Sequence, residues 1–205
     1  MRMNKMAHEN LELLLAGVGG QGIVFAGQIL MEAALRQGYK VYGFEEHGMA
    51  RRGGAVASHI RFGENIFTPL IPIGKGNVLA AFEPAEALRH IQFIGPHATI
   101  ILNTKSVIPS SVSTGKHTYP NIEEIIHVFE DHGNKVLSLD ATTLAEESGN
   151  SIAMNVVMLG AICKSDVFPL PKDDIKDVIK KRSPSYSREI NLKAFDYGFT
   201  KIEDE

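Results

Sequence analysis

The sequence has a single cysteine, Cys163, among its 205 residues. One cysteine cannot form a disulfide within the chain, and it cannot by itself ligate an iron–sulfur cluster or a structural zinc ion. It stands in the apolar stretch MNVVMLGAICK, where a thiol most often behaves as a small buried hydrophobe. A disulfide framework, and a metal cluster held by this chain alone, are therefore excluded.

The chain also lacks a strong excess of charge of either sign, with 21 Lys and Arg against 24 Asp and Glu. Without a global field to attract DNA, RNA or an anionic membrane, we expect no nucleic acid and no membrane among its partners. The first residues, MRMNKMAHEN, carry charge but no apolar signal core, and no stretch approaches the roughly 20 apolar residues of a spanning helix. The sequence predicts a cytoplasmic protein.

What is present is the composition of an ordinary globular protein, with 44% hydrophobic and 22% charged residues. We expect one domain over residues 1–205, with residues 1–10 as a flexible N-terminus. LELLLAG reads as a buried strand, GIVFAGQILMEAALRQG as a helix ended by Gly38, and YKVYGFEE as the next strand. A strand, glycine loop, helix and strand in this order favour a right-handed parallel crossover.

The pattern then changes, because HGMARRGGAV is a basic, glycine-rich loop and AVASHIRFGENIFTPLI predicts two strands joined at GEN. GNVLAAFEP, ATIILNT and KVLSLDA predict further strands. Pro84 opens a helix that we expect to end at Gly95-Pro96. NIEEIIHVFEDHG, TTLAEESG, SIAMNVVMLGAICKS and KDDIKDVIKKR predict helices. The fold class is therefore α/β: a three-layer α/β/α single domain with a mixed, mainly parallel sheet and an inserted β-hairpin.

The first candidate site is the glycine loop after the first strand. A helix that starts from a tight glycine turn exposes unpaired N–H groups, which suit phosphate or carboxylate. A dinucleotide site would also need an acid at the end of the second strand, where Glu45 and Glu46 stand, but a basic loop and a hairpin replace its next helix and strand. The glycines could instead serve close strand–helix packing. The candidate residues are Gly17, Gly19, Gly20, Gln21 and Gly22.

The second candidate site is the basic loop EEHGMARRGG. Adjacent arginines followed by glycines offer a bidentate anion clamp beside backbone able to adopt positive φ, and a histidine adds a group that titrates near neutral pH. A solvated charged turn is the alternative interpretation. Because this loop follows the second strand, we expect it to meet the glycine loop at one edge of the sheet and form one anion site. Its candidate residues are His47, Arg51, Arg52, Gly53 and Gly54.

Four stretches together resemble a known family: GVGGQGIVFAGQILMEAAL, EEHGMARRGGAVASHIRFG, LIPIGKGNVLAAFEPAEALR and IILNTKSVIP. They resemble the gamma-type subunit of 2-oxoacid:ferredoxin oxidoreductases, and the resemblance continues through GNSIAMNVVMLGAI and SREINLKAFDYG almost to the end of the chain. The loop HGMARRGG is closest to the indolepyruvate, or arylpyruvate, branch of that family. No catalytic residue is assigned to this chain.

The resemblance implies an oxidoreductase subunit that is inactive alone. Enzymes of this family decarboxylate a 2-oxoacid on thiamine diphosphate, pass electrons through iron–sulfur clusters to ferredoxin and release an acyl-CoA. The resemblance places thiamine diphosphate, Mg and the clusters on a larger catalytic (alpha) subunit, and no cofactor or metal on this chain. It further implies that CoA is a co-substrate and that ferredoxin is reached through the complex. In isolation the chain could form a homodimer. A self-sufficient NAD(P)-binding oxidoreductase and a stand-alone nucleotide- or anion-binding module remain alternatives.

Overall fold

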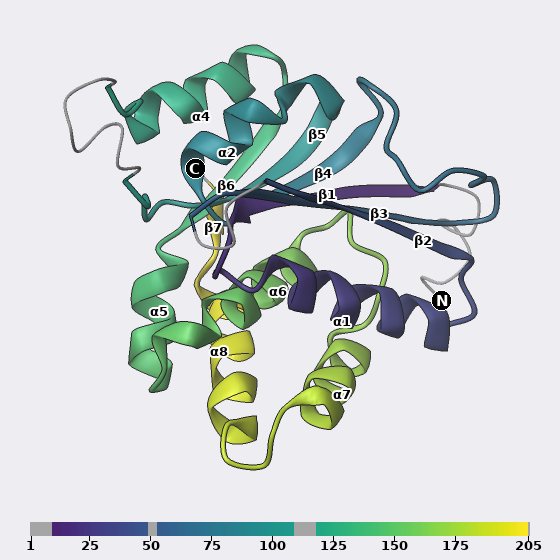
Figure 1. Ribbon diagram of the computed structural model, residues 1–205, viewed down its shortest axis with the longest axis vertical. Coiled ribbons are helices and arrows are strands. Elements are labelled where there is room, and N and C mark those ends of the chain that lie inside the picture. Colours follow the sequence, from purple (N-terminus) through teal and green to yellow (C-terminus); the bar gives the residue numbers. More distant parts are fainter. Residues whose placement is uncertain (1–9, 49–52, 109–117, 205) are drawn as a thin grey trace.

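The computed structural model describes residues 10–48, 53–108 and 118–204. In this part of the chain, strands form one seven-stranded sheet in the order β2-β3-β1-β4-β5-β6-β7 (Figure 1). The strands are β1 (Leu11–Val18), β2 (Val41–His47), β3 (Ala55–Phe62), β4 (Gly76–Ala81), β5 (Ile94–Asn103), β6 (Lys135–Leu139) and β7 (Glu203–Asp204). The prediction for residues 1–9 as a flexible terminus lies outside the described residues.

The sheet is mixed, as predicted. β1, β4, β5 and β6 are parallel neighbours, whereas β3 pairs antiparallel with both β1 and β2, and β7 pairs antiparallel with β6. The helix after β1 therefore leads to a strand two places away, with β3 between them. The expected crossover gives two strands of the same direction, but they do not pair.

The inserted hairpin exists, but the prediction that its strands join at GEN was wrong. It consists of β2 and β3, joined through residues 48–54. After Phe62 the chain leaves the sheet, and the segment 63–75 crosses the face of β3 instead of running along an edge. The cause is the Arg61 side chain, whose Nη1 donates to Thr68 O at 2.6 Å and to Leu70 O at 3.1 Å. Arg61 is itself held by a buried, two-pronged ion pair with Glu12.

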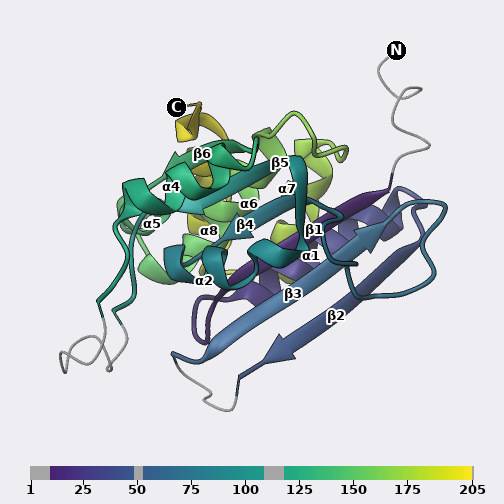
Figure 2. The ribbon, with the colours of Figure 1, turned by 90° about the horizontal axis from the view of Figure 1, so that it is seen from above.

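Helices cover the two faces of the sheet unequally (Figures 1 and 2). One face carries α1 (Ile23–Arg36), α5 (Ala141–Ser148), α6 (Met154–Lys164), α7 (Lys172–Arg182) and α8 (Arg188–Lys201). The other carries α2 (Pro84–Arg89) and α4 (Ile122–Asp131), with the short 3-10 turn η1 (Ile91–Phe93). A second such turn, η2 (Ser151–Ala153), precedes α6. Each face has its own apolar cluster, so the predicted three layers are present.

The helix that Pro84 opens is shorter than predicted, because it ends at Arg89 and β5 already begins at Ile94. Gly95 lies so close to the start of β4 that a Cβ atom there would be 2.8 Å from Gly74 O. Gly95-Pro96 therefore lies within β5, where the register with β4 shifts between the pairs Gly76–Ile94 and Val78–Thr99. None of the helices in the described ranges is long and apolar enough to cross a membrane.

Candidate functional site

The chain leaves two neighbouring parallel strands, β1 and β4, in opposite directions. β1 leads into α1 on one face of the sheet, and the adjacent β4 leads into α2 on the other. In open α/β sheets, ligands bind outside the carboxyl ends of the strands at such a switch point. The glycine loop 19–22 lies at this position, and we call it and the space beside it the switch crevice.

The two predicted loops meet there, as expected from their places in the sequence. Gly19 N donates a hydrogen bond to Gly54 O at 2.8 Å, and Gly53 N donates to Gly19 O at 3.2 Å. These bonds extend the pairing of β1 with β3 beyond the strand ends. Arg51 and Arg52, the predicted anion clamp, lie outside the described residues.

The first turn of α1 begins directly at the glycine loop. Its N-cap is Gly22, with φ 76°, and among the described residues no side chain caps the helix and no acid stands in its first turn. Unpaired N–H groups and the helix dipole give such an end a partial positive charge. At Gly20 (φ 107°) and Gly53 (φ 71°), none of the described residues comes within 4 Å of the position where a Cβ atom would stand. A ligand could therefore approach the backbone closely at both positions.

The floor of the switch crevice is fixed by two side-chain amides that share one acceptor. Gln21 Nε2 and Asn103 Nδ2 each donate to Phe82 O at 2.9 Å, and Gln21 Oε1 accepts from Val18 N at 2.8 Å. The ends of β1, β4 and β5 are thereby tied together. Gln21, predicted as a ligand-binding residue, here joins two strand ends.

The remaining glycines of the loop serve packing. A Cβ atom on Gly17 would stand 2.5 Å from Gln21 Oε1 and 2.9 Å from Phe82 Cβ, and one on Gly22 would stand 2.1 Å from Asn155 Nδ2. The Asn155 amide donates to Gly22 O at 3.4 Å, which ties α6 to the start of α1. The close-packing interpretation therefore holds for Gly17 and Gly22, whereas Gly20 and Gly53 face outwards.

Sequence reasoning missed Glu83, a buried carboxylate just after β4. Its Oε2 accepts from Glu86 N at 3.1 Å and caps α2, while its Oε1 accepts from Val107 N at 3.2 Å and from the Tyr119 hydroxyl. Burial, followed by the bond to Glu83, raises the pKa of Tyr119 far above its ordinary value. The Glu-Pro pair indicates a helix start, but nothing local in the sequence indicates the distant tyrosine.

The acidic residues expected for a dinucleotide ribose do not reach the glycine loop. β3 separates β2 from β1, which places the end of β2 about 10 Å from the loop. Glu45 lies 3.3 Å from His47 Nε2, and Glu46 lies 3.7 Å from His59 Nε2. His47 is thus at the correct end of the sheet but two strands away from Gly17. The geometry of a dinucleotide site is not formed.

The clearest hollow near the crevice, of about 370 Å³, lies beside the ends of β5 and β6. Its lining residues are Thr104, Ser138, Leu139, Asp140, Thr143, Leu144 and Lys201. Over the described ranges, no three His, Cys, Asp or Glu residues are grouped to hold a metal ion. Cys163 is buried, as predicted, and burial raises the pKa of its thiol to about 12. The described residues therefore show no cluster of metal ligands, and the thiol is buried and protonated.

These features define an α/β domain with a mixed sheet and a glycine loop at the switch point between β1 and β4. The chain belongs to the family described as pyruvate ferredoxin/flavodoxin oxidoreductase, which matches residues 12–201. It is 42% identical over 187 residues to the indolepyruvate oxidoreductase subunit IorB of Pyrococcus horikoshii, covering 91% of this chain and 93% of that protein. It is 27% identical over 195 residues to the pyruvate/ketoisovalerate oxidoreductases common subunit gamma of Pyrococcus abyssi, covering 94% and 97%.

Two solved structures share the fold. The gamma subunit of a keto/oxoacid ferredoxin oxidoreductase from Geobacter sulfurreducens has a TM-score of 0.67 at 23% identity, covering 93% of this chain and 97% of that one. The 2-oxoglutarate:ferredoxin oxidoreductase from Magnetococcus marinus, with 2-oxoglutarate, coenzyme A and succinyl-CoA bound, has a TM-score of 0.72 at 20% identity. That match covers 96% of this chain but 32% of the other, so there the fold is about a third of a longer chain.

Proposed function

We propose that this chain is the small subunit of a 2-oxoacid:ferredoxin oxidoreductase of the indolepyruvate type. The observation that carries the proposal is the 42% identity, almost end to end, with a subunit named for indolepyruvate oxidoreductase. Identity to the pyruvate/ketoisovalerate gamma subunit is lower, at 27%. An arylpyruvate such as indolepyruvate is therefore the proposed substrate.

The reaction of the assembled enzyme joins three events. The bond between the carboxylate carbon and the keto carbon of the 2-oxoacid breaks and releases CO₂. The CoA sulfur forms a thioester bond to the former keto carbon, and the thiol proton is released. The two electrons removed from the substrate reduce two molecules of ferredoxin, each by one electron. Acyl-CoA, CO₂ and two reduced ferredoxins are the products.

The cofactors of this reaction are proposed to reside on a larger catalytic subunit. When bound there, thiamine diphosphate with Mg supplies the electron sink for decarboxylation, and iron–sulfur clusters carry the electrons. The single cysteine of the present chain supports this division, because one thiolate cannot hold a cluster and Cys163 is buried and held in its protonated form. We expect the chain to be inactive alone.

The contribution of this chain is proposed to be an anion site for CoA phosphates at the switch crevice. The first turn of α1, which no described side chain caps, and the backbone at Gly20 and Gly53, which no described residue obstructs, support it. The adjacent arginines in the sequence, Arg51 and Arg52, suit phosphate as bidentate donors. In this arrangement the chain binds and orients the acyl acceptor, and the partner performs the chemistry.

Co-purification tests the subunit assignment. The tagged chain is drawn from its native extract, and the eluate is examined for brown colour and for viologen dye reduction. We expect a coloured, larger partner that reduces the dye only with an arylpyruvate, CoA and thiamine diphosphate. A colourless chain that is recovered alone and binds NAD(H) in a titration would instead support the self-sufficient dinucleotide-binding alternative.

Variants at two matched glycines test the CoA site in the assembled enzyme. Gly53 and Gly74 both have φ 71° and no described residue within 4 Å of a Cβ position, and of the two Gly53 is the one that adjoins the switch crevice. Asparagine tolerates this conformation, so neither substitution should alter stability appreciably. We expect Gly53→Asn and Arg52→Ala to raise the KM for CoA about tenfold or more while the KM for the 2-oxoacid stays constant, and Gly74→Asn to change neither. Unchanged CoA kinetics in both crevice variants would refute the site.

A further inference from the structure

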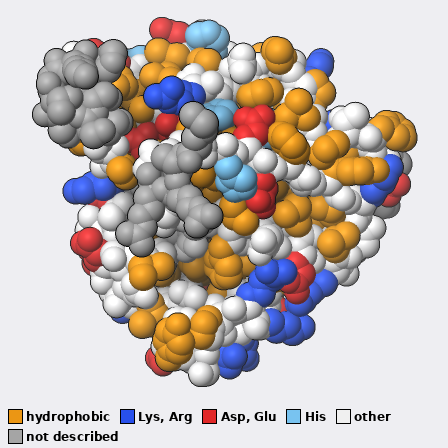
Figure 3. Space-filling model, viewed as in Figure 1, with side chains coloured by type: hydrophobic (Ala, Val, Ile, Leu, Met, Phe, Trp, Pro, Cys, Tyr) orange, Lys and Arg blue, Asp and Glu red, His pale blue; other side chains and the backbone are white. Residues whose placement is uncertain are grey.

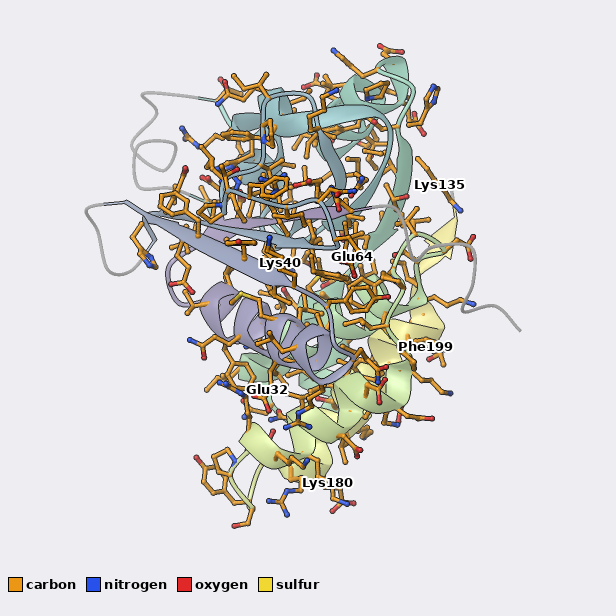
Figure 4. All side chains as sticks on the ribbon, turned by 90° about the vertical axis from the view of Figure 1, so that its right-hand side faces the viewer. Glu32, Lys40, Glu64, Lys135, Lys180 and Phe199 are labelled. Atoms are coloured by element: carbon orange, nitrogen blue, oxygen red, sulfur yellow. The ribbon has the colours of Figure 1, made fainter. Side chains whose placement is uncertain are left out.

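The two edges of the sheet differ in a way that bears on assembly. At one edge β7 has only two residues, both acidic in the sequence, and such a short, charged strand discourages further pairing. At the other edge β2 has seven residues, VYGFEEH, with no proline, and its register with β3 is uninterrupted. Figure 4 shows β7 beside Lys135 on one side of the molecule and the hairpin on the other.

The upper face of this hairpin is also uncovered by helices. In Figure 2, α2 and α4 lie over the middle of the sheet, while β3 and β2 extend beyond them. Hydrophobic side chains gather over the hairpin and the segment that follows it (Figure 3). The large exposed ones are Phe44 on β2 and Phe67, Leu70 and Ile73 in the segment 63–75.

The hydrogen bonds to β3 determine which backbone groups of β2 point outwards. Gly48 N donates to Ala55 O at 2.8 Å and Gly63 N donates to Lys40 O at 3.1 Å, so the even-numbered residues of the strand pair with β3. The N–H and C=O groups of the odd-numbered residues then face away from the sheet. No described strand pairs with these residues, which are Val41, Gly43, Glu45 and His47.

We propose that this edge pairs with the same edge of a second copy of the chain, antiparallel, with Gly43 on the two-fold axis. The sheet would continue from one copy into the other through the odd-numbered residues of both β2 strands. This dimer goes beyond the proposed oxidoreductase role and does not rest on it.

Charge and aromatic contacts favour this register over neighbouring registers that also match the outward groups. With Gly43 on the axis, Lys40 stands opposite Glu46 of the second copy, and Tyr42 stands opposite Phe44, on the open face of the sheet. With Phe44 on the axis, Lys40 and Glu46 have no charged residue opposite. With Glu45 on the axis, two glutamates face each other.

The other face of the strand also accommodates the pairing. Gly43 has no side chain there, and the Met31 sulfur of α1 occupies its place, since a Cβ atom would lie 2.4 Å from Met31 Sδ. Two such apolar positions would meet at the axis. On the open face, Lys40 lies over the Tyr42 and Phe67 rings, at 5.3 and 4.8 Å from their centroids. Figure 4 shows Lys40 at the hairpin.

The first test uses light scattering and sedimentation of the full chain with a proline at an outward position. Glu45→Pro removes an outward N–H but no bond to β3, so the fold should be retained. Glu45→Ala is its matched control, because it removes the same carboxylate and keeps the N–H. We expect a dimer for the wild type and for Glu45→Ala, and a monomer with an unchanged melting temperature for Glu45→Pro.

The second test examines the register. Lys40→Glu and Glu46→Lys each place like charges opposite one another twice in the dimer, so each should raise its Kd about tenfold or more. The double variant Lys40→Glu/Glu46→Lys restores opposite charges and should return the Kd to near the wild-type value. A double variant as weak as the singles would refute the Gly43 register.

Two results would overturn the dimer itself. One is a wild-type chain that stays monomeric up to about 100 μM, where a dimer of micromolar affinity is largely formed. The other is a Glu45→Pro variant that remains dimeric. If the wild type is monomeric and Glu45→Pro fails to capture the larger subunit, the edge belongs to that partner instead. A monomer that still captures a coloured partner leaves the proposed function intact.

Discussion

His59 on β3 is a histidine held in its neutral form by its surroundings. It is fully buried, its Nδ1 accepts from Ile71 N at 3.4 Å, and among the described residues its Nε2 has no hydrogen-bond partner. Burial lowers the pKa of His59 to about 4, and the nearby charges of His90 and Arg61 act in the same direction. Protonation of this ring is therefore easier in the unfolded chain, whose histidines have their ordinary pKa near 6.5.

The pH dependence of folding should report this difference. Because the folded pKa is lowered, the contribution of His59 to stability is fully present above about pH 6.5 and is lost as the pH falls towards 4. Between pH 7.5 and pH 5 we expect the free energy of unfolding of the wild type to fall by about 2 kcal/mol more than that of His59→Leu. Urea unfolding of both proteins at each pH measures the difference. Parallel profiles for the two proteins would contradict the prediction.

At this residue scale, the sequence located both loops of the switch crevice but could not divide their glycines by role. Gly17 and Gly22 are required by Phe82 and Asn155, which are distant in the sequence. Gly20, by contrast, has no described residue within 4 Å of its Cβ position. The hydrogen bond between Tyr119 and Glu83 was not predicted for the same reason, since only the folded chain brings the two side chains together.

Among the elements, α6 and α8 approach each other closely through two glycines. A Cβ atom on Gly198 would stand 1.8 Å from Val157 O, and one on Gly160 would stand 2.1 Å from Phe195 O. The obstructing atoms are backbone, so they can yield only if the helices separate. This contact holds α8 against α6, the helix buried at the centre of its layer.

Alanine at these contacts should therefore be costly. We expect Gly198→Ala to lower the free energy of unfolding by about 3 kcal/mol or more, despite the better helix propensity of alanine. Gly27→Ala is a matched control within α1, because its Cβ would meet the Ser58 hydroxyl oxygen, at 2.9 Å, and no backbone. Its change should stay within about 1 kcal/mol. Equal urea midpoints for the two variants would show that the helices can move apart freely.

Most elements were predictable because each carries its own periodicity and boundary signals. The hairpin itself was predicted, but the position of its turn was not, because the alternation of β3 continues past Phe62 into residues that would also suit a strand. What ends the strand is Arg61, which binds the carbonyl oxygens of Thr68 and Leu70 over the sheet face. This contact depends on Glu12, 49 residues away, and is invisible to local patterns.

For the whole molecule, the sequence predicted the three layers and the mixed sheet, but it did not predict the order of the strands. That order places β3 between β1 and β2, and it is what removes the acids of β2 from the glycine loop. It also leaves one long strand at an edge and the two-residue β7 at the other. Long-range strand pairing therefore determines two features: the acids of β2 are kept away from the glycine loop, and the two edges of the sheet differ in length.

The order of the strands also has a consequence for the growing polypeptide. Residues up to Asn103 complete five adjoining strands, β2 to β5 in the sheet, together with α1 and α2. The helices α5 to α8, which cover much of one face, are all encoded after that point. A chain emerging from the ribosome can therefore build most of its sheet while much of one apolar face has no cover, and this interval is when binding by a chaperone would matter most.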